Sequence, residues 1–517
     1  MNKKIILIAI ISILIIATGL GVFFVFQKPT LTQTKNGKCG DGVCDAKEKS
    51  KPKLCPKDCQ EIISDTQKNP ETKMEPSIKT SQKGTSHFII SIAGFLGNNY
   101  ESSLDYIKES GADDVRFMSR WGGMHWEKAE PQKGNFDWSF FDERYLAAKQ
   151  RGLKIMVTLY PSSPQWDNPN SEYDHEYPTD IEEYLKFVRM ATERYDGDGK
   201  DDAPGSPIVS DWILMEEIER GDGQKWWGGT PAQYADLFVK TYYAIKSANP
   251  DATIGTYGAN NWLGIKKDWI ETITKPVFNE IKKITSDKND FAFVYSMHYY
   301  QTQDMHEYLG NINFVKNMLN DVGLKDNPII MEDIAPFMKK TDPQKEQKLA
   351  KQIITSHIIS FANNLKTVGW AQLSDGFEYG ENFEAGIIST PNMSKKDMEK
   401  SFKNLGFYSY KLMTEKMEGI DWNDIKIIQE SDGVYIYQFS KNGRPFWVAW
   451  NDNSESKQTT LSNITSSQVK ITQAVPKYES GKDVTDYNTA FATEIKTVQN
   501  NTASVTLGDV PIFVEEK

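Results

Sequence analysis

The sequence predicts an α/β protein: a (β/α)8 TIM barrel followed by a small C-terminal antiparallel β-sandwich domain. Eight short apolar runs rich in β-forming residues lie between residues 88 and 373, and each is followed by a stretch with helical periodicity. Alternation of strands and helices over about 310 residues is typical of a barrel. The glycine-rich first turn that usually opens a doubly wound sheet is absent from the sequence.

The eight runs combine Ile, Val, Leu, Phe and Met with polar residues at their ends. They are FIISIA (88–93), DVRFM (114–118), LKIMVTL (153–159), DWILMEE (211–217), ATIGTY (252–257), FAFVYSM (291–297), PIIME (328–332) and TVGWAQL (367–373). Two of the following helices have marked starts. Thr179 and Glu182 have the spacing of a capping box, and Thr230 precedes a proline at the first helical position. We therefore expect the barrel to occupy residues 87–418.

The last hundred residues have a different pattern. Short segments of alternating polarity are separated by Asn, Gly and Ser, which is typical of antiparallel strands. These segments are VYIYQFS (434–440), PFWVAW (445–450), ASVTLG (503–508) and VPIFVE (510–515). We expect a separate β domain over residues 419–517, without a cluster of titratable residues that would form a site.

The N-terminus carries a membrane-spanning signal. A run of 22 almost wholly apolar residues, Ile5 to Phe26, follows Lys3 and Lys4. At about 1.5 Å per residue this run spans roughly 33 Å, which is enough to cross a bilayer core. We interpret residues 1–27 as an uncleaved signal-anchor helix, with a cleaved signal peptide as the alternative. The expected location is the cell membrane, single-pass, with the bulk of the chain extracellular.

All four cysteines lie close together beyond this segment, in CGDGVCDAKEKSKPKLCPKDC (39–59). An even number of cysteines outside a membrane suggests two disulfides, with three possible connectivities. The segment resembles the short CGDGxC…E…CPxDC modules of prokaryotic surface proteins. Its acidic residues either bind calcium or are simply solvated. We expect a disulfide-rich module over residues 28–60 and a polar linker over residues 61–86.

Charge and motifs exclude several classes of function. Lys and Arg number 60 and Asp and Glu 71, giving a net charge of −11, with no basic block outside the extreme N-terminus. Nucleic-acid binding is therefore not expected, because phosphate contacts need a concentrated positive surface. The sequence contains no GxGxxG opening a helix, no GxxxxGK[ST], no GxSxG and no HExxH. We expect neither a cofactor nor a catalytic metal.

Barrel enzymes carry their catalytic residues at the C-terminal ends of the strands. Glu217 ends the fourth run and Glu332 ends the seventh, and each directly follows apolar residues. Two carboxyl groups in different environments are what glycosidic cleavage requires, one as acid/base and one as nucleophile. The alternative is that both take part in structural ion pairs. Other polar or aromatic residues at strand ends are Arg116, Tyr160, Glu216, His298, Tyr300, Asp333, Trp370 and Asp375.

Three stretches resemble a known group of enzymes. They are VRFMSRWGGMHWEKAEPQKGNFDWSFFD with GLKIMVTLY and SPQW, then VSDWILMEEIERGDGQKWWGGTPAQYADLFVKTYYAIKSANPDATI, and PIIMEDIAPF. Together they are similar to the large (β/α)8 clan of retaining glycoside hydrolases over residues 88–415. The xylosidase-like and cellulase-like families are the most similar.

The resemblance implies roles for individual residues. Glu217 matches the acid/base of the W-x-x-x-N-E-P pattern, and Glu332 matches the nucleophile of the T-E-x-G type. Three further roles are implied: contact with the nucleophile for Arg116, the strand-six H-x-Y pair for His298 and Tyr300, and a position under the reacting sugar for Trp370. The sequence departs from the pattern at Glu216, where the clan has an asparagine that hydrogen-bonds the sugar 2-hydroxyl.

Aromatic residues after the strand ends also favour a sugar ligand, because sugar C–H faces pack on aromatic rings. They are Trp121, Trp126, Trp166, Tyr173, Tyr177, Trp226, Trp227, Trp262, Tyr299, Phe377 and Tyr379. We place Trp121 in the substrate site with Arg116, Glu216, His298, Tyr300 and Trp370. The sequence thus predicts a membrane-anchored extracellular retaining glycoside hydrolase acting on an oligo- or polysaccharide. The alternative, favoured by Glu216, is a non-catalytic surface carbohydrate-binding protein with a degenerate barrel.

Overall fold

The computed structural model of the chain describes residues 87–92, 100–220, 225–260, 267–286, 291–301, 304–336, 338–375, 384–389 and 401–517. All of them belong to one compact unit, Gln82–Lys517. The predicted signal-anchor, cysteine module and linker lie outside the described residues, as do Trp262, Phe377 and Tyr379. In the part of the chain that is described, no helix combines the length and apolar character needed to cross a membrane.

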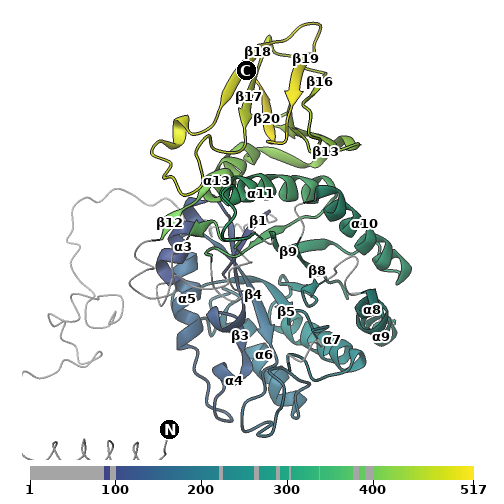
Figure 1. Cartoon of the computed structure of the whole chain (residues 1–517). Helices are drawn as coiled ribbons and strands as arrows, with labels where there is room; N and C mark the ends of the chain where they lie inside the picture. Colours follow the sequence, from purple (N-terminus) through teal and green to yellow (C-terminus); the bar gives the residue numbers. More distant parts are fainter. Residues whose placement is uncertain are drawn as a thin grey trace, which may run out of the picture. The chain divides into compact units, whose positions relative to one another are not determined.

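A closed parallel sheet forms the centre of the first domain (Figure 1). Its strands are β1 (Phe88–Ile92), β2 (Asp114–Phe117), β4 (Lys154–Tyr160), β5 (Val209–Leu214), β6 (Thr253–Gly255), β8 (Tyr295–Gln301), β9 (Ile329–Pro336) and β10 (Val368–Ala371). They pair in the order β6-β5-β4-β2-β1-β10-β9-β8. A bridge between Gly255 and Val294 joins the two edges, and the Val294 amide donates to the Ile254 carbonyl at 2.9 Å. The prediction of a (β/α)8 barrel is confirmed.

A helix of at least ten residues follows each of these strands before the next barrel strand begins. They are α3 (Tyr100–Glu109), α5 (Ser139–Gln150), α6 (Ile181–Arg194), α7 (Pro231–Ala248), α9 (Lys275–Ile284), α10 (Met305–Asp321), α11 (Lys345–Ala362) and α13 (Leu405–Met417). Pro231 opens α7 as predicted, and Thr230 and Gln233 form a capping box. The cap of α6 lies one residue later than predicted, because the Asp180 side chain accepts the Glu183 amide.

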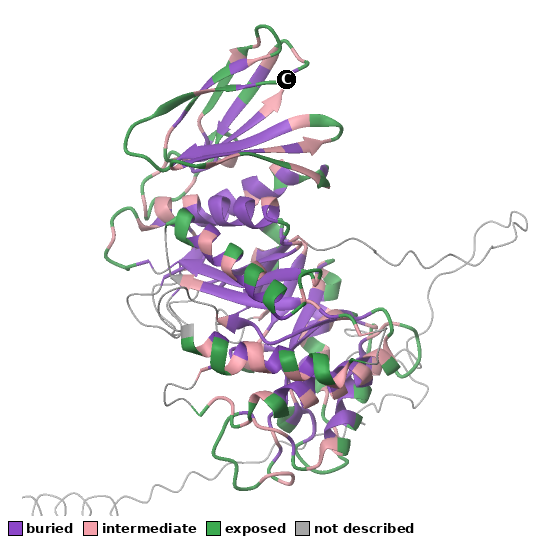
Figure 2. Cartoon of the chain, turned by 90° about the vertical axis from the view of Figure 1, so that its right-hand side faces the viewer, coloured by how far each residue is buried: buried purple, intermediate pink, exposed green. Residues whose placement is uncertain are grey.

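The arrangement of strands inside and helices outside determines which residues are buried (Figure 2). The strands are buried on both faces, and the helices turn one face toward them and the other toward solvent. Inside the barrel, Ile89, Met156, Ile213 and Ile330 form a small apolar cluster. Polar and charged side chains that occupy the barrel interior must therefore find partners among themselves. Two short strands extend the sheet near the site: β3 (Met124–His125) beside β4, and β7 (Ala259–Asn260) beside β8.

The C-terminal region forms antiparallel sheets, as predicted. Six strands pair in the order β13-β14-β15-β20-β17-β18, and β16 pairs with β19 in a second sheet. The strands are β13 (Ile420–Ser431), β14 (Val434–Lys441), β15 (Arg444–Asn451), β16 (Lys457–Leu461), β17 (Gln468–Gln473), β18 (Thr493–Thr497), β19 (Ala503–Leu507) and β20 (Ile512–Glu516). Both sheets contribute to one apolar core. Hydrogen bonds attach this domain to the barrel helices, including Ser409 to the Ala474 carbonyl at 2.7 Å and the Gly481 amide to Glu346 at 2.8 Å.

Candidate active site

A cavity of about 910 Å³ opens at the C-terminal ends of the barrel strands. Its buried titratable lining comes from Glu216 and Glu217 just after β5, His298 within β8 and Asp333 within β9. Further charged groups of the lining are Arg120, Glu127, Asp174 and Arg220. Its aromatic lining comes largely from the loops after β2, β4 and β5. The aromatic side chains there are Trp121, Tyr173 and Trp226, together with Tyr300 on β8. This is the end of the barrel at which TIM-barrel enzymes carry their active sites.

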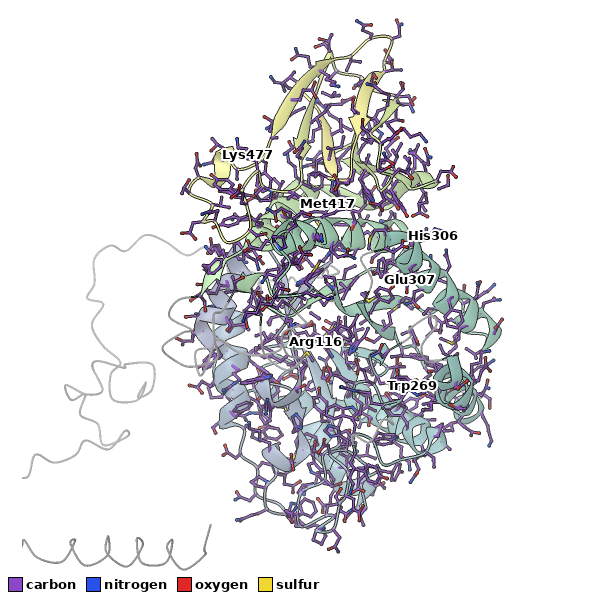
Figure 3. All side chains as sticks on the ribbon, in the orientation of Figure 1. Arg116, Trp269, His306, Glu307, Met417 and Lys477 are labelled. Atoms are coloured by element: carbon purple, nitrogen blue, oxygen red, sulfur yellow. The ribbon has the colours of Figure 1, made fainter. Side chains whose placement is uncertain are left out.

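Arg116 on β2 lies at the centre of the barrel, beneath this cavity (Figure 3). Its guanidinium forms ion pairs with Glu216, with Glu332 (Nε to Oε2, 3.1 Å) and with Asp333 (Nη1 to Oδ2, 2.7 Å). Burial alone would lower the pKa of Arg116, but Asp333, Glu332 and Glu216 raise it well above its usual value. A fully buried cation needs such partners, because removal from water without them is prohibitive.

His298 on β8 links the carboxylates of β5 to those of β9. Its Nδ1 lies 2.8 Å from Glu217 Oε1, and its Nε2 lies 3.0 Å from Glu332 Oε1 and 3.7 Å from Asp333 Oδ2. Burial alone would lower the pKa of His298, but the charge of Asp333 and the hydrogen bonds to Glu217 and Glu332 raise it well above its usual value. The imidazolium therefore donates from both nitrogens, and its ring stands between the two glutamates.

The loop after β5 directs two consecutive glutamates toward the cavity. Successive side chains of a regular strand point to opposite faces, so this requires a break in the strand geometry. Met215 and Glu217 provide the break with φ angles of +71° and +43°. Such left-handed backbone in bulky residues is costly and occurs mainly at functional sites. Glu217 also accepts hydrogen bonds from Asn260 Nδ2 at 3.3 Å and pairs with Arg220 Nε at 3.2 Å.

Glu216, which stands where the clan has asparagine, is contacted by two donor side chains. The Tyr160 hydroxyl donates to Glu216 Oε2 at 2.5 Å, and Arg116 pairs with Oε1. Burial raises the pKa of Glu216, although Arg116 works in the opposite direction. A carboxylate accepts at both oxygens, whereas an amide would present an N–H to one of these donors. A carboxylate at position 216 therefore suits the two donors beside it better than an asparagine amide would.

The structure brings most of the predicted site residues together. Glu216, Glu217, His298, Tyr300 and Trp121 line the cavity, and Arg116 and Glu332 lie buried beneath it. Trp370 does not line the cavity; it is fully buried and donates its indole N–H to the Ala385 carbonyl at 2.8 Å. Among the loop aromatics that the structure describes, Trp121, Tyr173 and Trp226 line the cavity. Trp126, Trp166, Tyr177, Trp227 and Tyr299 pack into or against the apolar core.

One wall of the cavity was not predicted from the sequence. Ser162 Oγ lies 2.9 Å from both His125 Nδ1 and His175 Nδ1, and all three residues line the cavity. The Tyr160 ring stacks on both imidazoles, at centroid distances of 4.3 Å and 4.9 Å. Burial lowers the pKa of His125 to about 4 and that of His175 well below its usual value, so both imidazoles are neutral. The only sequence signal is that His175 lies in the loop after the third run.

One group of cavity residues has donor atoms close enough for a metal ion. Among the described residues of the cavity, Glu216, His298 and Asp333 bring ligand atoms within 4.8 Å of one another. Arg116 already forms ion pairs with both of these carboxylates. The cation at this position is thus supplied by the protein itself.

Comparison with known proteins shows which solved structures share this fold. No family model matches the chain, and no curated protein matches it. Among solved structures, a family 39 glycoside hydrolase from Bacteroides cellulosilyticus is 14% identical, with a TM-score of 0.57 over 83% of this chain and 80% of that one. A monomeric β-xylosidase from Caulobacter crescentus is 14% identical, with a TM-score of 0.56 over 84% and 96%.

A third similar structure is a family 30 endoxylanase from Clostridium papyrosolvens, 12% identical, with a TM-score of 0.53 over 84% of this chain and 96% of that one. At these identities the likeness shows the fold. The chain thus has the fold of glycoside hydrolases over most of its length, and its chemistry has to be argued from its own site.

Proposed function

We propose that the protein is a retaining glycoside hydrolase that cleaves O-glycosidic bonds of an oligo- or polysaccharide. The observation that carries the proposal is the convergence of carboxylates from β5 and β9 on one cavity that also carries Trp121, Tyr173 and Trp226. Aromatic rings pack against the C–H faces of a sugar, and polar groups bind its hydroxyls. Carboxylates facing each other across such a cavity supply the acid/base and the nucleophile.

The proposed reaction is a double displacement. Glu217 protonates the glycosidic oxygen while a carboxylate of β9 attacks the anomeric carbon, and the bond to the leaving oxygen breaks. Glu217, now ionised, takes a proton from water, which displaces the carboxylate and releases the sugar with its original configuration. The sequence predicts Glu332 as the attacking residue, and that assignment stays a prediction. The reaction needs no cofactor.

The experiment compares Glu217→Ala with Glu127→Ala in the full-length protein. Glu127 lines the same cavity and lies on α4 (Trp126–Ala129), away in sequence from the strands that carry the charged cluster. On xylosides with poor leaving groups, Glu217→Ala should lower kcat/KM about 10²–10⁴-fold, the usual contribution of an acid catalyst. On 2,4-dinitrophenyl glycosides the loss should be much smaller, because that leaving group needs no proton. Equal losses on both substrates would contradict the role of Glu217.

Xylosides are the first substrates to test because two of the similar structures are named as a β-xylosidase and an endoxylanase.

The second candidate is a surface carbohydrate-binding protein with a degenerate barrel. The observation that favours it is the His298 ring, which stands between Glu217 and Glu332, the two glutamates predicted from the sequence. This candidate predicts measurable binding of oligosaccharides without hydrolysis on a broad panel of aryl glycosides and polysaccharides. It also predicts that Glu217→Ala leaves the affinity for these ligands nearly unchanged.

We also propose that the protein is held at the outer face of the cell membrane by its first 27 residues. The uninterrupted apolar run and the two preceding lysines support this. The full-length protein should fractionate with membranes and retain its N-terminal peptide in mass spectra. A mature N-terminus between about residues 20 and 35 would indicate a cleaved signal peptide instead.

A further inference from the structure

We infer that Asp333, rather than its neighbour Glu332, is the nucleophile of the proposed glycosidase. The inference rests on the proposed function and deepens it by assigning the attacking atom. Both residues lie in the middle of β9 (Ile329–Pro336), and both pair with Arg116. They differ in what each carboxylate faces: Asp333 lines the cavity, and Glu332 does not.

The pairing of β9 with β8 explains why consecutive residues differ in this way. Met331 pairs with Met297, and the next pair is Asp333 with His298, so Glu332 is an extra residue that has no partner on β8. The pairing of β9 with β10 shifts at the same place. A bulge of this kind re-aims the side chains that follow it. It sets Asp333 opposite His298, at the level of the cavity.

Glu332 is fully buried and lies outside the cavity lining. One oxygen accepts from His298 Nε2 at 3.0 Å, and the other pairs with Arg116 Nε at 3.1 Å. A methyl group at Gly258 would collide with Glu332 Oε1 and with His298, so the carboxylate packs directly against the backbone between β6 and β7. The ring of His298 separates it from Glu217. Glu332 therefore holds the side chains of His298 and Arg116 in position.

The contacts of Asp333 suit an attacking carboxylate. Oδ2 accepts from the Tyr300 hydroxyl at 2.9 Å and from Arg116 Nη1 at 2.7 Å, and Oδ1 accepts from Ser91. Tyr300 itself lines the cavity. Burial alone would raise the pKa of Asp333, but Arg116 and His298 outweigh it and lower the pKa. The carboxylate is thus charged, oriented by donors and adjacent to the space that a substrate would fill.

The chemical step balances with these residues alone. A carboxylate oxygen of Asp333 forms a bond to the anomeric carbon while the glycosidic C–O bond breaks and the leaving oxygen takes the proton of Glu217. The product is an aspartyl glycosyl ester. Water, losing its proton to Glu217, then attacks the same carbon, and the ester C–O bond breaks to regenerate the Asp333 carboxylate.

Trapping the covalent intermediate tests this assignment. The full-length protein is incubated with 2,4-dinitrophenyl 2-deoxy-2-fluoro-β-xyloside, and then with the corresponding glucoside. Digestion and tandem mass spectrometry locate the added sugar. A label on Asp333 is the expected result, and a label on Glu332 would overturn the assignment while supporting the proposed glycosidase. No label, together with no hydrolysis of any aryl glycoside, would overturn the proposed function and the assignment with it.

Two variants provide the kinetic control. Asp333→Asn should lower kcat on the order of 10⁴-fold or more, the scale seen when a nucleophile is removed. Glu332→Gln keeps the volume and an oxygen for His298, so it should lose far less activity and should still be labelled at Asp333. Azide should restore turnover of a dinitrophenyl glycoside to Asp333→Ala but not to Glu332→Ala. Only the space left by the Asp333 side chain opens into the cavity, where azide can reach the anomeric carbon. Rescue of Glu332→Ala alone would contradict the inference.

Discussion

His298 and His175 line the same cavity and are almost equally buried, with 1% and 3% of their surfaces exposed. His298 lies among Glu217, Glu332 and Asp333, and its pKa is raised well above the usual value. His175 shares Ser162 with His125 and stacks on Tyr160, and burial lowers its pKa well below the usual value. One imidazole is therefore charged at neutral pH, and the other is neutral.

The difference shows that the neighbours, rather than burial, decide the charge of each histidine. The segment just after β5 and the middle of β8 and β9 form a charged region in which Arg116 and His298 balance several carboxylates. Ser162 and the two neutral histidines offer uncharged and aromatic faces to the cavity, with Glu127 and Asp174 beside them in the lining. A glycosidase needs both kinds of surface: charge where the glycosidic bond breaks, and aromatic faces where sugar rings bind.

Loss of the central cation should have the largest effect. Arg116→Met leaves Glu216, Glu332 and Asp333 buried without their shared partner. We expect the free energy of unfolding to fall by about 3–5 kcal/mol, because the uncompensated charges stay out of water. Urea denaturation at pH 7 measures the change. Arg120→Met is the matched control, since Arg120 lies on the cavity rim with an exposed side chain, and it should change stability by less than about 0.5 kcal/mol.

The barrel was predictable from the sequence because its signals are local. Apolar runs followed by helical periodicity marked all eight strands, and strand ends pointed to Glu217 and His298. The bulge in β9 was not predictable, because it arises from the pairing of β9 with β8 and β10. The contact of His125 with His175 through Ser162 joins loops that lie far apart in sequence, so no local pattern indicates it.

A smaller effect should follow from removing a single hydroxyl between the two regions. Tyr160 stacks on the neutral histidines, and its hydroxyl donates to the charged Glu216 at 2.5 Å and accepts from the Ser119 amide at 2.9 Å. Tyr160→Phe keeps the stacking and removes both hydrogen bonds. We expect a loss of about 1.5–3 kcal/mol in unfolding free energy, as for hydrogen bonds to charged groups. A loss below about 0.5 kcal/mol would show that Glu216 does not depend on this donor.

The smallest effect concerns the pH dependence of stability, and it addresses the two histidines directly. In the unfolded chain His175 has a pKa of about 6.5, whereas in the folded protein its pKa lies well below the usual value. Below pH 6.5 the unfolded state therefore binds a proton that the folded state does not, so stability falls as the pH falls. The slope contributed is at most about 1.4 kcal/mol per pH unit.

His175→Asn, whose amide replaces Nδ1 toward Ser162, should remove this contribution. Urea denaturation at pH 7, 6 and 5 should show that the variant loses less stability on acidification than the parent. His306→Asn, at an exposed position near the start of α10, is the matched control and should leave the slope unchanged. His298→Asn should instead change the stability profile at higher pH. The pKa of His298 is raised in the folded protein, so its protonation stabilises the fold below pH 6.5, and this stability is lost as the pH rises through the pKa of the folded state. If both variants changed the same side of the profile, the assignment of one charged and one neutral histidine would be disproved.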